Sequence, residues 1–383
     1  MHYIRFLKSP RLIDNSLRSA PSSLTAKITI TTDLGESFLW EDINVIAELV
    51  SQDGEKVVGK GVEYAWKGRE GMRGLEVVLR ISPRVDGVVR MRVRSVSGEL
   101  DVRRLSEVVD RMGKDEEGSV VGVWSMDVNL STSSAKVKEV QPPLAERVFQ
   151  IGDGKALHIW EETGESIARH IWDAGLTLSS YLHTISPISS MSTSTTSSKL
   201  PVLEKLLQEK SELNIIELGA GCGIVSLTLY HHFPQISNLI LTDLPEASEI
   251  LSHNISHPPF PQSPSRNSTT TLKHEVLDWS QPLPSFASEK KWDLVMVADC
   301  TYNPDVVPDL VKTLKELTSE EGGKEGKGLV CVAMKVRHES EIVFFDLMTE
   351  ARFEVLEKCR IPIGVLGGEG EEIEIFVFGR KGE

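Results

Sequence analysis

A glycine-rich turn between an apolar segment and a helix-forming segment is the feature that most constrains this fold. Residues 215–225 read Ile-Ile-Glu-Leu-Gly-Ala-Gly-Cys-Gly-Ile-Val, which spaces Gly219, Gly221 and Gly223 as G-x-G-x-G. Glycine permits a positive φ and lets a ligand approach the backbone, and the start of a following helix offers free N–H groups. The segment therefore predicts a strand, a ligand-binding turn and a helix of an α/β sheet.

Strand-like and helix-like segments alternate from about residue 146 onward, which is typical of a doubly wound parallel sheet. The expected strands are 214–218, 238–242, 272–277, 292–300, 328–336, 353–360 and 372–379, and the expected helices are 223–233, 246–257, 304–318 and 338–351. Only 361–371 separate the last two strands, too few residues for a helical crossover, so we expect those strands to pair antiparallel. Residues 141–383 are thus predicted to form one Rossmann-like seven-stranded α/β domain.

Three segments interrupt this alternation. Residues 184–198 and 258–271 are rich in Ser, Thr and Pro, and residues 319–328 are rich in Gly and Glu. Each contains too few apolar residues to pack into a core, so we expect surface insertions there.

Residues 1–140 are instead predicted to form an N-terminal, mostly β domain. Apolar and polar residues alternate in 75–81 and 89–94, and the turn-forming residues between them predict a hairpin with one buried face. Further strands are expected at 26–32, 45–51 and 120–128, with a short helix within 101–112. The pattern favours a small antiparallel sandwich or barrel. Arg90, Arg92 and Arg94 are expected on a solvated strand face, with a docking surface as the alternative.

Charge and cysteine content narrow the classes of function. The 21 basic and 21 acidic residues of 1–140 balance, so the net charge of −14 arises within 141–383. An acidic domain repels the phosphates of a nucleic acid, which argues against such a partner, and it suits a basic protein substrate. The alternative is that the acidic residues only keep the surface soluble. The four cysteines form no Cys-x-x-Cys pair, which predicts buried reduced thiols and no metal site.

No signal-like or membrane-spanning apolar run is evident in the sequence. We therefore expect a cytoplasmic protein without a membrane partner, with the nucleus as an alternative and a mitochondrial location disfavoured.

The residues around the glycine turn indicate which nucleotide is bound. A dinucleotide site needs G-x-G-x-x-G, whereas here the third glycine comes one residue early. Asp243 ends the next expected strand, twenty residues after Gly223, where a carboxylate can accept both ribose hydroxyls. This combination fits S-adenosylmethionine better than NAD, because a nucleoside without a pyrophosphate does not need the longer loop. The alternative is a tight turn followed by a capping aspartate.

Further motifs carry a family resemblance. Residues 171–176 read Ile-Trp-Asp-Ala-Gly-Leu, residues 277–279 read Leu-Asp-Trp, and residues 297–304 read Val-Ala-Asp-Cys-Thr-Tyr-Asn-Pro. With the glycine turn and the Thr-Asp-Leu-Pro of 242–245, residues 146–380 resemble the seven-β-strand protein-lysine methyltransferases, the group that modifies elongation factors and chaperones. The resemblance implies S-adenosyl-L-methionine as cofactor and a lysine of a protein as acceptor.

The resemblance also implies roles for individual residues. Trp172 would pack against the methionine end of the cofactor, Asp243 would bind the ribose, and Asp299 and Tyr302 would lie beside the acceptor nitrogen as catalytic residues. The other implied cofactor contacts are Glu217, Gly219, Ala220, Gly221, Gly223, Trp279 and Ala298. Asn303 and Pro304, rather than Asp299, are expected to begin the following helix.

The chemistry of methyl transfer also supports these residue types, independently of the family resemblance. Methyl transfer to an amine requires two positioned partners and an amine that has lost its proton, which desolvation and a nearby acceptor promote. A small-molecule N-methyltransferase on the same fold and a non-catalytic binding module remain as alternatives. We expect a monomer whose N-terminal domain helps to recognise the protein substrate or a partner.

Overall fold

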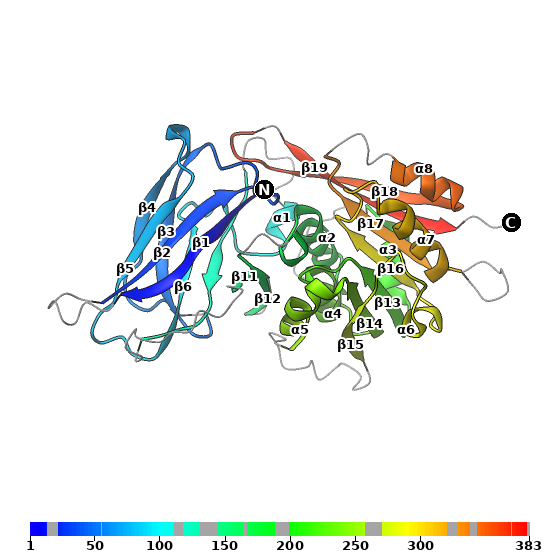
Figure 1. The fold of residues 1–383 in the computed structure, drawn as a ribbon, viewed down its shortest axis with the longest axis horizontal. Coiled ribbons are helices and arrows are strands. Elements are labelled where there is room, and N and C mark those ends of the chain that lie inside the picture. Colours follow the sequence, from blue (N-terminus) through cyan, green and yellow to red (C-terminus); the bar gives the residue numbers. More distant parts are fainter. Residues whose placement is uncertain are drawn as a thin grey trace.

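The computed structural model of the protein describes most of the chain, and the statements below concern those residues. They are 1–13, 22–54, 56–110, 118–130, 144–152, 154–163, 167–187, 199–256, 270–319, 328–337, 343–368 and 370–380. Most of the three predicted insertions, namely 188–198, 257–269 and 320–327, lies outside them. Two β sheets lie at one end of the molecule, and a third sheet flanked by helices lies at the other (Figure 1).

The N-terminal residues form two packed sheets. The first has the order β5(Leu75–Arg80)–β2(Ser23–Thr31)–β1(His2–Ile13)–β8(Val120–Val121)–β7(Asp101–Val102). The second has the order β12(Lys155–Glu162)–β11(Leu144–Gly152)–β9(Val123–Ser125)–β6(Val88–Ser95)–β3(Asp42–Ser51)–β4(Val62–Lys67), with β10(Val128–Asn129) beside β6. Buried side chains of both sheets, among them Phe6, Ile28, Trp66 and Met91, share one core. Of the predicted antiparallel sandwich or barrel, the structure has a sandwich, although β8 pairs parallel with β1 and β7. The short helix α1(Glu107–Asp110) lies within the expected range.

The predicted hairpin of 75–81 and 89–94 is wrong. Strand β5 pairs with β2 in the first sheet, whereas β6 pairs with β3, β9 and β10 in the second. The turn residues between them carry the chain from one sheet to the other. Alternating polarity shows that each strand has a buried face, but it does not say which strand is the neighbour.

The predicted solvated arginine face is also wrong. Arg90 is buried, donates to the Ser125 carbonyl oxygen over 2.7 Å and forms an ion pair with Glu146. Arg92 and Arg94 both bind the Glu48 carboxylate of the neighbouring strand β3, at 2.7 and 3.0 Å. These arginines therefore belong to a network of buried and partly buried ion pairs.

The third sheet has the parallel strands with helices on both faces that were predicted for a doubly wound α/β fold. Its strands run β15(Thr271–Val276)–β14(Ile236–Asp243)–β13(Leu213–Leu218)–β16(Leu294–Ala298)–β17(Leu329–Met334)–β19(Glu371–Arg380)–β18(Phe353–Ile363). The first five strands are parallel, and β19 is antiparallel to both of its neighbours. The expected antiparallel pairing of the last two strands is therefore confirmed.

Helices cover both faces of this sheet. Ile215 packs with α2(Asp173–Thr184), α4(Ile224–His232) and α5(Ser248–Ser256), whereas the next residue, Ile216, packs with α7(Val307–Leu317) and α8(Val343–Glu350) on the other face. The remaining helical elements are η2(Gly68–Glu70), η4(Ile167–Arg169), α3(Pro201–Glu209), η6(Pro245–Ala247) and α6(Ser285–Ser288). Helix α7 begins at Val307 rather than at residue 304, and residues 304–306 form a turn in which the Asn303 side chain accepts the Asp305 N–H over 3.0 Å. Residues 338–342 of the expected last helix lie outside the described residues.

The two parts of the chain are closely joined. Strands β11 and β12 follow residue 140 but pair with the N-terminal strands, β11 with β9 at Ala145 and Ser125. Phe149 and Leu157 of these strands, with Tyr3 of β1, belong to the same buried cluster as helices α2 and α4. The division at residue 140 stays a prediction, and the sheet that begins before that residue continues to residue 162.

None of the helices in the described residues is both long and apolar enough to cross a bilayer.

The four cysteines, Cys222, Cys300, Cys331 and Cys359, are buried free thiols, as predicted.

A buried ion pair stabilises the junction between the parts. The Arg147 guanidinium is fully buried, donates to the Gly122 carbonyl oxygen over 2.7 Å and pairs with Glu161 at 2.5 Å. Glu161 also accepts the Ile171 N–H at 3.0 Å, just before α2. Burial alone would raise the pKa of Glu161, but Arg147 and Arg5 outweigh burial and lower it to about 2.

Replacing Glu161 by glutamine should therefore lower the free energy of unfolding by about 3–5 kcal/mol, because Arg147 would remain buried without its carboxylate. Glu41→Gln, which removes the partner of the exposed Arg69, should cost less than about 1 kcal/mol. Urea denaturation measures both. The carboxylate stabilises the fold above its unfolded pKa of 4.5, and this contribution is lost as the pH falls toward about 2. The difference between wild type and Glu161→Gln should shrink over that range, and a difference independent of pH would contradict the assignment.

Candidate active site

The predicted site residues follow the carboxyl ends of adjacent parallel strands. Leu218, the last residue of β13, pairs with Thr242 of β14 and with Val297 of β16, so these three strands end at one level. Carboxyl ends of parallel strands meet at one edge of a sheet, where ligands bind in such folds. The glycine turn, Asp243, Trp279 and Asp299 therefore lie along the same edge.

The glycine turn adopts a conformation that other residues rarely accept. Gly219, Gly221 and Gly223 have φ values of +64°, +55° and +80°. A Cβ on Gly219 would lie 2.4 Å from the Cys300 Sγ and 3.5 Å from the Trp279 ring. The Ala220 N–H donates to the Thr242 carbonyl oxygen over 2.9 Å, which ties the turn to β14. The turn is thus compact, and the Trp279 ring lies beside it.

Asp243 is held in place by backbone donors. Its Oδ2 accepts the Gly221 N–H and its Oδ1 accepts the Leu244 N–H, each over 2.7 Å. Burial raises the pKa of this carboxyl above its usual value, although the two N–H groups oppose the rise. Each carboxylate oxygen keeps a further lone pair, so the side chain can accept hydrogen bonds from a diol beside the glycine turn.

Glu217 has a different environment from the one that the resemblance implies. Its carboxylate accepts the Ser226 N–H over 3.0 Å and the Ser226 hydroxyl, in the first turn of α4. Burial raises the pKa of Glu217 to about 7. The carboxylate therefore fixes α4 against β13, and its described bonds are made within the protein.

Asp299 is a buried carboxylate in a strained backbone conformation. Its φ is +58°, and its N–H donates to the Ala333 carbonyl oxygen over 2.9 Å. The Arg337 guanidinium binds both carboxylate oxygens, over 2.7 and 2.8 Å. Burial raises the pKa of Asp299, and Arg337 counteracts that rise. Left-handed non-glycine residues are concentrated at functional sites, which agrees with the predicted role of this residue.

Of the other predicted residues, Ala298 and Tyr302 belong to the same segment as Asp299, and Trp172 lies near Arg337. Trp172 is the N-cap residue of α2, and the Arg337 guanidinium lies 5.7 Å from the centre of its ring. Ala298 is the half-buried last residue of β16. Tyr302 follows three residues after Asp299 and is 51% exposed, so its ring is open to an incoming molecule.

Four charged residues at this edge were not predicted as site residues. Arg337 and Lys335 follow the end of β17, Asp173 begins α2, and Asp33 lies in the β2–β3 loop of the sandwich. Lys335 Nζ lies 3.0 Å from Asp173 and 3.5 Å from Asp33. Two basic residues directly after an apolar strand were a usable signal for Arg337 and Lys335, whereas no feature of the sequence near Asp33 marks it.

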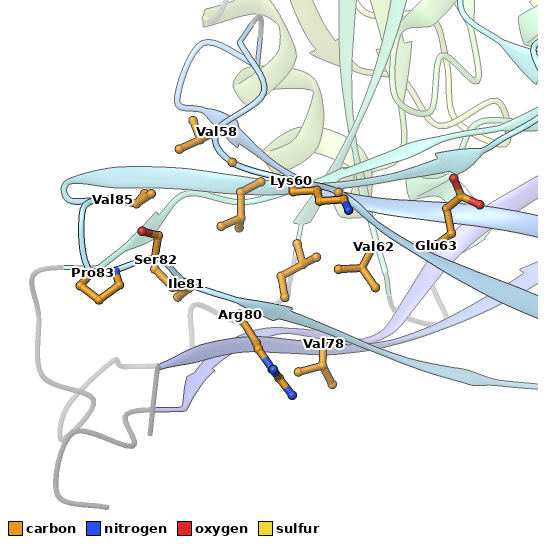
Figure 2. Close-up of a pocket in the computed structure, with 14 residues that line it drawn as sticks. Val58, Lys60, Val62, Glu63, Val78, Arg80, Ile81, Ser82, Pro83 and Val85 are labelled. Atoms are coloured by element: carbon orange, nitrogen blue, oxygen red, sulfur yellow. The ribbon is translucent and has the colours of Figure 1, made fainter. Parts of the chain in front are cut away.

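A separate cavity of about 1000 Å³ opens between the edge strands β4 and β5 of the sandwich (Figure 2). Its lining is mainly aliphatic, with Lys60, Glu63 and Arg80 as the charged members. The Tyr64 hydroxyl bridges this edge, donating to the Val78 carbonyl oxygen over 2.6 Å and accepting the Val78 N–H over 2.7 Å. None of the predicted cofactor or acceptor residues lines this cavity.

Comparison with known proteins assigns the reaction class. Residues 151–351 match the family model described as lysine methyltransferase. The chain is 25% identical over 351 residues to a UPF0665 family protein of Schizosaccharomyces pombe, covering 90% of this chain and 92% of that protein. It is 28% identical over 242 residues to protein N-lysine methyltransferase METTL21A of Mus musculus, covering 63% of this chain and 86% of that protein.

One solved structure similar to this chain is a SAM-dependent methyltransferase from Methanosarcina mazei. The two chains are 15% identical with a TM-score of 0.33, over 48% of this chain and 98% of the other. At that level of similarity the fold assignment rests on the strand order of the third sheet.

The Gly219→Ala substitution should destabilise the protein by about 2–4 kcal/mol, because it adds a clash with Cys300 to the cost of a left-handed alanine. Gly71→Ala is a matched control, since Gly71 has a φ of +77° with open space around it, and should cost about 1 kcal/mol. Denaturant unfolding measures both. The double variant Gly219→Ala/Cys300→Ala should recover part of the loss, and equal destabilisation of the two single variants would show that Cys300 does not constrain the turn.

Proposed function

Because the chain belongs to the lysine methyltransferase family, we propose that it transfers a methyl group from S-adenosyl-L-methionine to a lysine side chain of a protein. The family match supports the reaction, and the similarity to a named protein N-lysine methyltransferase supports a protein acceptor. The observation that carries the proposal is the buried, strained Asp299 beside the three-glycine turn, at the carboxyl edge of the sheet.

The residues at this edge fit the cofactor. Bound S-adenosylmethionine supplies an electrophilic methyl group on a positively charged sulfur. The backbone of Gly219–Gly221, whose two glycines have positive φ values, would lie against the cofactor, and Asp243 would accept hydrogen bonds from the ribose hydroxyls. Trp279 and Ala298 would lie beside the adenine, and Trp172 would lie at the methionine end. Glu217 acts through the position of α4, since its carboxylate binds Ser226.

The acceptor amine must be neutral and aligned before it can attack. A lysine ammonium has no lone pair. Transfer of the lysine side chain from water into the site lowers its pKa, so that its proton is lost more easily. The ionised carboxylate of Asp299 accepts an N–H of the acceptor and directs the nitrogen lone pair toward the methyl group. Tyr302 offers an exposed aromatic face, which favours the nitrogen as it becomes positively charged.

The acidic charge of the chain and the family resemblance support a more specific class of protein substrate. We propose a translation factor or a chaperone as substrate, with a basic segment that suits the acidic charge of residues 141–383. We further propose that the enzyme acts as a cytoplasmic monomer without a nucleic-acid partner. The N-terminal sandwich, which packs against the methyltransferase sheet through β11 and β12, is proposed to contribute to substrate recognition.

Methyl-labelled S-adenosylmethionine, the purified protein and a lysate of cells lacking it should yield a labelled protein band. Asp299→Asn should reduce its labelling by about a hundredfold, because the neutral amide does not hold the amine with the same charge or geometry. Asp305→Asn, which changes an exposed aspartate six residues away, is the matched control and should label normally.

The alternatives predict different outcomes of the same assay. Label in the filterable fraction alone would favour a small-molecule methyltransferase. No transfer to any fraction would favour a non-catalytic binding module. Undiminished labelling by Asp299→Asn would remove Asp299 from the acceptor site.

A further inference from the structure

Arg337 is bound by carboxylates from two distant parts of the chain. Its NH1 and NH2 groups bind the two oxygens of Asp299, and NH2 also binds Asp33 Oδ2 over 2.8 Å. Asp299 and Arg337 follow the neighbouring strands β16 and β17, whereas Asp33 belongs to the β2–β3 loop of the sandwich. One guanidinium therefore connects the sandwich to the carboxylate assigned to the acceptor amine.

Because these side chains are buried, their orientations are restricted. The side chains of Asp33, Asp299 and Arg337 are 1%, 4% and 18% exposed. A buried carboxylate without a cationic partner takes up a proton or draws in water, and a planar guanidinium is suited to hold both of its oxygens in one orientation. Asp33 is itself anchored, since Lys335 Nζ lies 3.5 Å from its Oδ1 and also binds Asp173 at 3.0 Å.

Arg337 also reaches the other side of the site. Its guanidinium lies 5.7 Å from the centre of the Trp172 ring. Trp172 is the residue assigned to the methionine end of the cofactor. A displacement of Arg337 would therefore disturb the acceptor carboxylate and this aromatic wall together. Because methyl transfer depends on the alignment of donor and acceptor, such a displacement acts on the rate more than on cofactor affinity.

We propose that Arg337 and Asp33 are positioning residues of the acceptor site: Asp33 holds the guanidinium, and Arg337 holds Asp299 charged and oriented toward the acceptor amine. The inference rests on the proposed methyl transfer to a protein lysine. It makes the β2–β3 loop of the sandwich part of the catalytic apparatus, in addition to any contact that the sandwich makes with the substrate.

The test uses full-length variants, labelled S-adenosylmethionine and the protein band labelled by wild type. Asp33→Asn should lower the initial rate at saturating cofactor by on the order of ten- to a hundredfold, with the dissociation constant of S-adenosylmethionine within about twofold of wild type by calorimetry. Asp33→Glu should restore part of the rate. Asp101→Asn is the matched control, since Asp101 is an equally buried aspartate of the same sandwich that pairs with Arg103 and Arg94 away from the site. It should leave the rate near that of wild type.

Chemical rescue separates positioning from a general loss of stability. Arg337→Ala should be slow, and millimolar guanidinium should restore part of its rate, whereas urea at the same concentration should not. Arg337→Lys should also remain slow, because an ammonium cannot bind both oxygens of Asp299 in the same plane.

Three results would overturn the inference. Asp33→Asn could transfer methyl groups at the wild-type rate, or guanidinium and urea could have the same effect on Arg337→Ala. Arg337→Ala could also exceed the wild-type rate, which would show that the guanidinium obstructs the acceptor position. Failure of wild type to label any protein would instead overturn the proposed function, and this inference with it.

Discussion

The bidentate contact between Arg337 and Asp299 is the interaction on which the arrangement of the proposed acceptor site depends. Asp299 has a left-handed backbone and a buried carboxyl group, and both conditions are unfavourable in isolation. The guanidinium offsets the cost of the buried charge and fixes the orientation of the oxygens. Its second carboxylate, Asp33, comes from the loop that connects β2 of the first sheet to β3 of the second. The geometry of the site is therefore shared between two sheets that are distant in sequence.

A second constraint comes from the parallel strands. Because β13, β14 and β16 end at one level, a short turn after β13 meets the side chains that follow its neighbours. Gly219 has no side chain where Cys300 and Trp279 approach, and Asp243 binds the N–H of Gly221. These contacts make the turn compact without a contribution from a long loop. Glu217 accepts the Ser226 N–H at the start of α4, the helix that directly follows the glycine turn.

The expectations that failed share a physical cause. Alternating polarity in β5 and β6 was correctly read as two strands with buried faces, yet the strands belong to different sheets. The arginines of β6 were expected in water, but Glu48 of β3 and Glu146 of β11 lie opposite them and form buried ion pairs. In both cases the local pattern of polar and apolar residues is compatible with more than one neighbouring strand. Packing between segments far apart in the chain determines which strand that is.

The sequence by itself determined the strands of the α/β sheet, the helices α4, α5, α7 and α8, the glycine turn and the aspartates that end β14 and follow β16. These features depend on local spacing, because the periodicity of apolar residues and the conformational freedom of glycine act over a few residues. Only the tertiary structure decided that Arg337 and Asp33 meet Asp299, that Glu217 turns toward α4, and that β11 and β12 complete the sandwich sheet. Such contacts join residues up to about three hundred positions apart, and a buried charge finds its partner only where the packed sheets bring the two together.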